Sequence, residues 1–344
     1  MAHVTPLPPP AREAIELDES RRLYLVENLG RGNAAAVYRG YLEGGSRLKR
    51  AVAVKVFDVA SSDERDIVIP RLARVARHSA CVHHPNVASV TEFGLFGPAE
   101  PYFIGELVQG RSLAALMEAL VLAGQRMPLD LALFIGTEIA EGLIGARLAI
   151  SPDDQRQIGV VHGDLSMREV LLSWNGEVKV TDFGVSRAVG AASTVRRIGM
   201  LARRAATVAP EVACGQKGDA RSDVFSLGVL LHEILVGPRF PSTMSDTEML
   251  DMASEGFVDA PMFAPQLPAD IRTLVERALE VDPSRRFPHS GAVAYELRRA
   301  AMAMGVGDGR LFLRHAMQNV LDQTMSDESD ERPVAAHSLA RSRR

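Results

Sequence analysis

The chain has 344 residues, of which 47% are apolar and 24% are charged. This composition is typical of a globular protein and excludes disordered, collagen-like and disulfide-stabilised classes. The 39 basic and 43 acidic side chains give a net charge of -4, so composition favours neither nucleic acid nor an anionic membrane as a partner. Cys81 and Cys214 stand too far apart in sequence for a zinc motif, and we expect a reducing, cytoplasmic location.

The two ends of the chain differ in composition from the part between them. Residues 1–21 contain a proline-rich stretch that predicts a flexible leader, and neither a signal peptide nor a membrane-spanning segment is predicted. Residues 304–323 predict one amphipathic accessory helix. Residues 324–344 combine separate acidic and basic blocks with few apolar side chains, a pattern that predicts a disordered tail.

From residue 22 to residue 105 the pattern is mainly that of short strands separated by glycine and charged turns. One helix interrupts them, and we place its start at Pro70, because proline is favoured in the first turn of a helix. The residues on its predicted inner face are Leu72, Val75, Ala76, Ser79 and Val82.

From residue 111 to residue 303 helical periodicity dominates, with a strand hairpin over 170–180 around an Asn-Gly turn. The predicted helices cover 113–123, 129–148, 222–236, 269–279 and 290–304. The sequence therefore predicts an α+β fold with a small β-rich lobe over 22–105, a hinge over 106–110 and a larger helical lobe over 111–303.

Two features of the β-rich part suit a phosphate ligand. Gly30 and Gly32 lie in a loop between two predicted strands, where small residues let backbone amides approach a phosphate closely, although a plain hairpin turn explains them equally well. Lys55 ends an alternating apolar strand. Its charge fits an anionic partner, or its side chain extends to solvent.

A second group of motifs follows in the helical part. Asp164 lies in the run His-Gly-Asp-Leu, and Asp182 opens Asp-Phe-Gly after the predicted hairpin. Two acids beside one hairpin suit one proton acceptor and one metal ligand, although each alone is more often a surface or capping residue. Ala-Pro-Glu ending at Glu211, Asp223 at the start of a helix, and Arg286 complete an ordered set.

In order and spacing these motifs resemble the eukaryotic-like serine/threonine protein kinases of the bacterial type, over about residues 23–301. The resemblance implies the bilobal protein kinase fold and transfer of the γ-phosphate of ATP to a protein hydroxyl, with Mg²⁺ or Mn²⁺. It assigns Asp164 as the acceptor of the substrate proton and Asp182 as a metal ligand. The ATP-binding residues that it implies are Leu29, Gly30, Gly32, Val37, Ala53, Lys55, Glu106, Val108 and Leu171. It also implies a structural ion pair between Glu211 and Arg286, and support of the catalytic loop by Asp223.

The chain departs from the family pattern at the helix of the small lobe. That helix carries a glutamate paired with the strand lysine in the family, and the spacing from Lys55 leads here to Arg74 or Val75. We therefore expect this ion pair to be absent. Glu64 and Asp66 could replace it only if the helix starts before Pro70.

Further departures lie in the catalytic loop. Glu169 replaces the asparagine that binds the second metal, and it either serves as a ligand or turns away to pair with an arginine. Ser166 replaces a lysine, which removes a donor worth about 3 kcal/mol of transition-state stabilisation. Arg168, four residues after Asp164, is the side chain that we expect to compensate.

Gly163 replaces the arginine that receives an activation-loop phosphate in the family. The segment between Asp182 and Glu211 nevertheless carries five arginines and no acid. We expect it either to meet an acidic partner or a phosphate on Ser193 or Thr194, or to be a solvated basic loop. Gly105, in the place of the gatekeeper, predicts an open back pocket or one filled by a neighbouring side chain.

The first hypothesis is therefore a protein serine/threonine kinase, slow or conditionally active, that acts on a protein substrate. The second is a pseudokinase that serves as a nucleotide-binding scaffold or signalling partner. The third hypothesis is a small-molecule phosphotransferase. The motif ending at Glu211 and the one opening at Asp223 make this hypothesis less favoured.

Overall fold

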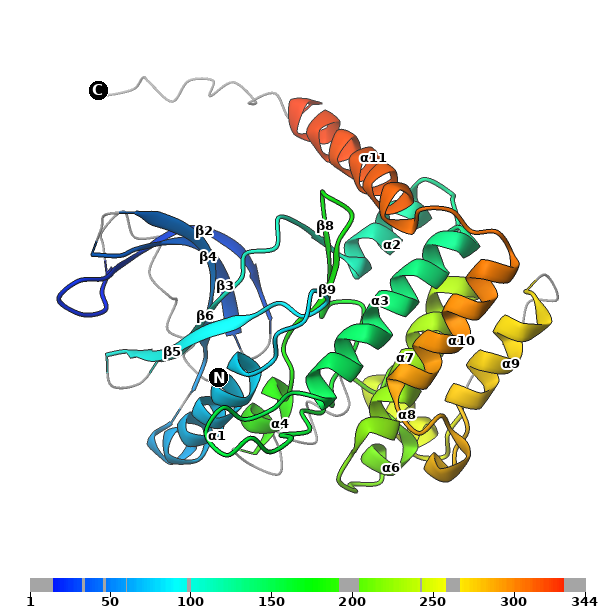
Figure 1. The fold of residues 1–344 in the computed structure, drawn as a ribbon, viewed down its shortest axis with the longest axis horizontal. Helices are drawn as coiled ribbons and strands as arrows, with labels where there is room; N and C mark the ends of the chain where they lie inside the picture. Colours follow the sequence, from blue (N-terminus) through cyan, green and yellow to red (C-terminus); the bar gives the residue numbers. More distant parts are fainter. Residues whose placement is uncertain are drawn as a thin grey trace, which may run out of the picture.

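The computed structural model describes residues 15–330, except 33–34, 46–47, 60, 98–99, 192–203, 242 and 258–266. Figure 1 shows two lobes side by side, a curved sheet with one helix against it and a larger group of helices. The bilobal α+β architecture expected from the sequence is confirmed.

The smaller lobe is built on an antiparallel sheet of six strands in the order β1-β2-β3-β4-β6-β5. In β4, Val52, Val54 and Val56 are buried, while the residues between them are partly exposed on the opposite face. The strands are β1 (Ile15–Glu16), β2 (Arg22–Arg31), β3 (Ala35–Glu43), β4 (Lys49–Phe57), β5 (Val90–Phe96) and β6 (Glu100–Gly105). β1 pairs with β2 and lies inside the segment 1–21, for which the sequence predicts a flexible leader.

Helix α1 (Ser62–Ala80) packs against this sheet and begins well before the predicted start at Pro70, which lies inside the helix. The prediction of the start was wrong because Ser61 caps the helix, its hydroxyl accepting from the amide of Glu64, and acidic residues occupy the first turn. The predicted inner face is largely confirmed, since Leu72, Ala76 and Ser79 are buried.

The larger lobe is organised around α3 (Leu129–Arg147) and α7 (Ala220–Leu235), which pack against each other and against α10 (Ser290–Ala303). Their apolar side chains form one continuous core. The other helices around them are α2 (Leu113–Leu122), α4 (Val185–Gly190), α6 (Pro210–Ala213), α8 (Asp246–Ser254), α9 (Ala269–Ala278) and the short 3₁₀ helix η2 (Pro283–Arg285). None of the helices in the described residues is long and apolar enough to cross a membrane.

A three-stranded sheet, β7 (Gly110–Ser112), β8 (Val170–Ser173) and β9 (Val178–Val180), lies where the two lobes meet. Helix α11 (Gly309–Asp330) crosses the outside of the large lobe, with Leu313 and Met317 fully buried against it (Figure 1). The helix continues beyond residue 323, where the sequence analysis begins a disordered tail. Residues 331–344 lie outside the described part.

Candidate active site

Three strands from the two lobes turn one partly open face toward the junction between them. Val37 on β3, Ala53 on β4 and Leu171 on β8 are partly exposed, whereas the strand residues on either side of each are buried. Leu29 on β2 is 45% exposed. An apolar face left uncovered between two lobes is suited to bind a flat apolar ring.

Gly30 lies near the end of β2, and Gly32 follows the strand at the start of the turn to β3. Gly32 donates its amide to the carbonyl of Ala35 at 2.8 Å. An added Cβ would meet nothing within 4 Å at Gly30 and only the Ala35 carbonyl oxygen, at 3.7 Å, at Gly32. The packing of the loop therefore does not require glycine at either position, which leaves close approach of a ligand as a reason for both.

The segment connecting the lobes passes beside the open face. The amide of Glu106 donates to the carbonyl of Ser89 at 2.9 Å, and its carboxylate pairs with Lys179 at 2.8 Å. Neither the amide nor the carbonyl group of Val108 has a hydrogen-bond partner among the described residues. Backbone groups rarely stay unpaired, so those of Val108 are available to a ligand edge.

Gly105 precedes this segment, and its backbone lies close to Ser89. An added Cβ at Gly105 would be 2.5 Å from the Ser89 carbonyl oxygen, so a larger residue requires the backbone to move. A cavity of about 10 Å³ lies nearby, lined by Val90, Phe103 and Asp182 among others.

Lys55 and Asp182 form the ion pair at the centre of the site, with Lys55 Nζ 2.6 Å from Asp182 Oδ2. The helix position expected for a glutamate is apolar, because Val75 of α1 faces Gly184 of the Asp-Phe-Gly turn. Asp182 has φ of 69°, in the left-handed region that residues other than glycine adopt uncommonly. Lys55 therefore contacts the acid expected to bind metal.

Asp164 lies in the same site and is already engaged. It accepts a hydrogen bond from the hydroxyl of Ser186 and pairs with Arg204, whose Nε lies 3.2 Å from Asp164 Oδ1. Burial raises the pKa of Asp164, and the Arg204 guanidinium opposes this rise. The sequence gives no signal for Ser186 and distinguishes Arg204 only as one of several loop arginines, because neither belongs to a motif.

Asp223 on α7 holds the loop that carries Asp164. The carboxylate of Asp223 accepts from the amides of His162 and Gly163, both at 2.8 Å. Burial raises the pKa of Asp223 to about 6 despite these two bonds, and burial lowers that of His162 to about 4. The predicted support of the loop by Asp223 is confirmed.

Glu169 contacts another residue of the catalytic loop and forms no described ion pair with an arginine. Its Oε2 accepts a hydrogen bond of 2.5 Å from the hydroxyl of Ser166, so the two departures in this loop contact each other. Burial, and then the nearby charge of Asp164, raise the pKa of Glu169 to about 7. The site holds negative charge that its own residues do not neutralise.

Carboxylate oxygens are suited to a hard divalent cation, and Asp182 and Glu169 supply them here. Within the described part of the chain, no three His, Cys, Asp or Glu side chains are grouped as a complete metal site. A magnesium ion bound by one or two carboxylates takes its remaining ligands from substrate phosphates and water, and the two acids fit that pattern.

Arg168, which the sequence suggests as the side chain that compensates for Ser166, is exposed, and no described ion pair joins it to Asp164. Arg187 of α4 instead occupies the space beside Gly163, donating to the Val161 carbonyl at 3.1 Å. Arginines from the following segment thus provide positive charge near Asp164 that the catalytic loop itself lacks.

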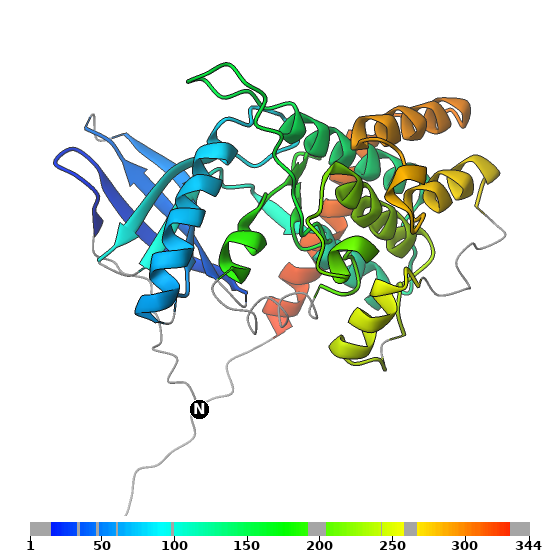
Figure 2. The same cartoon turned by 90° about the horizontal axis from the view of Figure 1, so that it is seen from below.

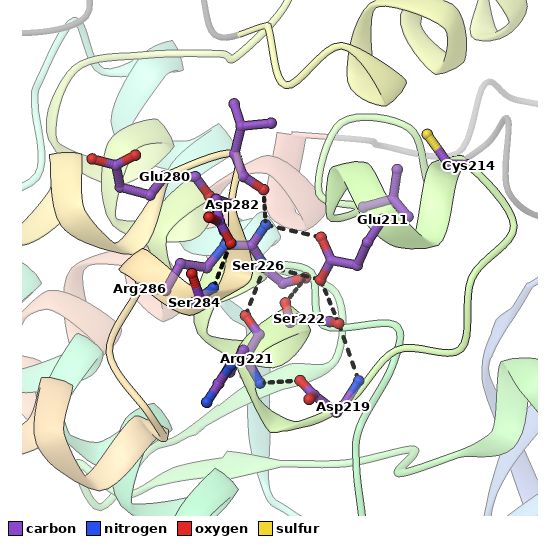
Figure 3. Close-up of polar contacts among 12 residues, drawn as sticks. Glu211, Cys214, Asp219, Arg221, Ser222, Ser226, Glu280, Asp282, Ser284 and Arg286 are labelled. Carbon is purple, nitrogen blue, oxygen red and sulfur yellow. Dashed lines mark hydrogen bonds and ion pairs between the residues drawn. The ribbon is translucent and has the colours of Figure 1, made fainter.

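Beyond the loop, Glu211 and Arg286 form the predicted ion pair, shown in Figure 3. Two guanidinium nitrogens lie 2.9 and 2.8 Å from the two carboxylate oxygens, and the Arg286 side chain is fully buried. Arg286 also donates to the carbonyls of Arg221, Glu280 and Val281. The pair links α6 to the segment that follows η2. Ser193 and Thr194, the proposed phosphate acceptors, lie outside the described residues.

The two lobes and this arrangement of lysine, aspartates and ion pair define a protein kinase domain. A family model described as "Protein tyrosine and serine/threonine kinase" matches residues 23–293. The chain therefore belongs to the protein kinase family.

Its relatives are bacterial kinases. Serine/threonine-protein kinase PknA of Mycobacterium tuberculosis is 33% identical over 254 residues, covering 72% of this chain and 55% of PknA. A probable serine/threonine-protein kinase of Streptomyces coelicolor, SCO3848, is 29% identical over 300 residues, 85% of this chain and 42% of its own. Tyrosine-protein kinase MasK of Myxococcus xanthus is 29% identical over 274 residues, 78% of this chain and 41% of MasK. The chain spans about half the length of these relatives.

Proposed function

We propose that this chain is an ATP-dependent protein serine/threonine kinase whose activity is slow or conditional. The observation that carries the proposal is the meeting of Lys55, Asp164 and Asp182 at the edge of the open apolar face between the lobes. The names of the PknA and SCO3848 relatives support serine and threonine as acceptors.

In the proposed site the adenine ring lies between Val37, Ala53 and Leu171 and is recognised by the free backbone groups of Val108. The loop of Gly30 and Gly32 covers the phosphates. Leu29 and the backbone of Glu106 complete the pocket. Apolar walls with a few fixed polar groups are what a nucleotide base requires.

The reaction is the attack of a substrate hydroxyl oxygen on the γ-phosphorus of ATP. The bond from that phosphorus to its bridging oxygen breaks, ADP leaves, and Asp164 accepts the hydroxyl proton. Lys55 leaves Asp182 to contact the α- and β-phosphates, which frees the Asp182 carboxylate for the metal. Bound Mg²⁺ or Mn²⁺ supplies charge neutralisation of the phosphates, with Asp182 and Glu169 as its protein ligands.

Two features favour slow or conditional activity. Ser186 and Arg204 each contact one oxygen of Asp164 and compete with a substrate hydroxyl for this carboxylate. Ser166 also provides no charge for the developing negative charge on the transferred group, a loss of about 3 kcal/mol or about a hundredfold in rate. A pseudokinase is less well supported, because the three charged groups are retained and the relatives are named as kinases.

The test is transfer of radiolabelled phosphate from ATP to casein by the purified chain, in Mg²⁺ and separately in Mn²⁺. We expect phosphoserine and phosphothreonine in the product, and loss of transfer in Asp164→Asn. Transfer that persists in Asp164→Asn would reveal a contaminating kinase, and no transfer with either metal would favour the pseudokinase. A thermal shift separates binding from catalysis, because ATP at about 100 times its Kd stabilises a folded protein by about 2.7 kcal/mol.

A further inference from the structure

A cavity of about 620 Å³ opens directly beside Asp164. Its walls come from α1 and α4 on one side and from the segment after α6 on the other, where Lys217 and Gly218 line it. Figures 1 and 2 show α4 next to α1, and α6 across from them on the same side of the large lobe. The volume lies in the range of about 300–1,000 Å³ found for ligand pockets.

Four cationic side chains line this cavity, namely Arg71, Arg187, Arg204 and Lys217. Arg204 is paired with Asp164, but no described carboxylate lies within ion-pair distance of Arg71, Arg187 or Lys217. Of these three, Arg187 makes one hydrogen bond, to the carbonyl of Val161. Most of its guanidinium donors are free to bind an anion.

The acids in the lining do not balance these charges. Asp223 is buried and occupied by the amides of His162 and Gly163, and Asp164 is occupied by Ser186 and Arg204. The cavity is therefore electropositive, although the whole chain carries a net charge of -4.

The positive surface continues outside the cavity. Arg74 and Arg77 follow Arg71 along the exposed side of α1 and also have no described carboxylate partner. Burial, together with Arg74 and Arg77, lowers the pKa of the neighbouring His78. A basic strip that leads to a basic cavity attracts acidic molecules over distances of about a Debye length.

We propose that this cavity binds the acidic side chains that flank the target hydroxyl of a protein substrate, so that the chain acts on serine or threonine in carboxylate-rich segments. The proposal rests on the proposed kinase function. Arg71 on α1 and Lys217 after α6 determine specificity for aspartate and glutamate, and Asp164, which lines the same cavity, meets the hydroxyl.

The proposal is tested first by binding, without nucleotide. Fluorescence anisotropy with the full chain would compare three labelled peptides with one central serine, flanked by glutamates, by glutamines, or by glutamines and one phosphoserine. We expect the glutamate peptide to bind at least about tenfold more tightly than the glutamine peptide, as two or three ion pairs of up to about 1 kcal/mol each would give.

The variants Arg71→Gln and Lys217→Gln should each raise the Kd for the glutamate peptide by about threefold to fivefold and leave the Kd for the glutamine peptide unchanged. Arg74→Gln is the matched control, because Arg74 is exposed on the same helix but does not line the cavity. Equal binding of the glutamate and glutamine peptides, or an Arg74→Gln effect as large as that of Arg71→Gln, overturns the proposal. Binding of the phosphoserine peptide alone overturns the assignment to carboxylates.

Phosphate transfer separates this proposal from the proposed function. In the active protein, Arg71→Gln should raise KM for the glutamate peptide without changing kcat. If transfer occurs with the same KM for the glutamate and glutamine peptides, the specificity proposal fails and the kinase stands. If the glutamate peptide binds selectively but no peptide is phosphorylated, the kinase function fails and the acidic binding site stands.

Discussion

Replacing Glu169 by glutamine tests how much stability the folded protein loses when this carboxyl group ionises. Glu169 is held close to Ser166 and to the charge of Asp164, and burial raises its pKa from 4.5 to about 7. Glutamine keeps the size of the side chain and an oxygen that can accept from Ser166, and it removes the ionised form. The variant therefore isolates the cost of ionising this one group inside the folded protein.

The magnitude follows from the two pKa values. A carboxyl group of pKa 4.5 in the unfolded chain and about 7 in the folded protein costs about 3 kcal/mol of unfolding free energy once it is fully ionised. Between these values the folded protein keeps a proton that the unfolded chain has released. The wild-type protein therefore loses stability as the pH rises from about 4.5 to about 7, and the cost is constant above that range.

Urea unfolding of the metal-free wild type and of Glu169→Gln at pH 5 and pH 8 measures this directly. We expect a small difference at pH 5 and a variant more stable by up to about 3 kcal/mol at pH 8. Asp223 and Glu233 also have raised pKa values, but they titrate in both proteins and cancel in the comparison. The same difference at both pH values would refute the reasoning, because Glu169 would then not titrate in this window.

Magnesium with ATP adds a second measurement on the same pair. If Glu169 is a ligand together with Asp182, saturating Mg²⁺ and ATP should stabilise the wild type more than Glu169→Gln. The difference in unfolding free energy between the two proteins at pH 8 should then become smaller. If Mg²⁺ and ATP leave this difference unchanged, Glu169 is not a ligand of the metal.

Substitutions at three positions test the backbone and the ion pair. Gly163→Ala should lower the unfolding free energy by about 1–2 kcal/mol, because φ is 72° there; a neutral effect in urea would show that the loop relaxes. Asp182→Gly should have an unfolding free energy about 1 kcal/mol higher than that of Asp182→Ala, because only glycine relieves φ of 69°; equal unfolding free energies would show that no strain is stored. Arg286→Met should cost about 3–5 kcal/mol by leaving the largely covered Glu211 carboxylate without its charged partner, and an unchanged urea midpoint would contradict the role given to this pair.

The order of motifs was sufficient to predict the fold and the positions of the charged residues in the site. Lys55, Asp164 and Asp182 can be found because each follows a recognisable strand or loop pattern. The start of α1 could not be found in this way. Pro70 suggested a first turn, but burial of Val68 and Leu72 on both sides of it carries the helix through the proline.

The contacts made by these residues depend on distances that sequence does not contain. Ser186 reaches Asp164 across 22 positions, and Arg204, which belongs to no motif, also pairs with it. The partner of Lys55 is 127 positions away. A pattern can show that a lysine needs an anion, but only the folded structure, which brings β4 beside the segment after β9, shows that Asp182 provides it.

The departures from the family pattern compensate one another locally. Ser166 and Glu169 depart in the same loop and share a hydrogen bond, and Arg187 fills the space beside Gly163. These contacts maintain the loop, while Arg204 pairs with Asp164, the proposed proton acceptor, and donates to the carbonyl of Gly163.

Arg204 also lines the cavity proposed to bind acidic segments. A substrate carboxylate in that cavity competes with Asp164 for the Arg204 guanidinium, and the ion pair that blocks Asp164 weakens when the acid binds. The same acidic segment that fits the cavity would thus free the group that accepts its proton. Conditional activity is therefore expected to depend on the substrate, and neutral peptides should be phosphorylated slowly even at saturating concentration.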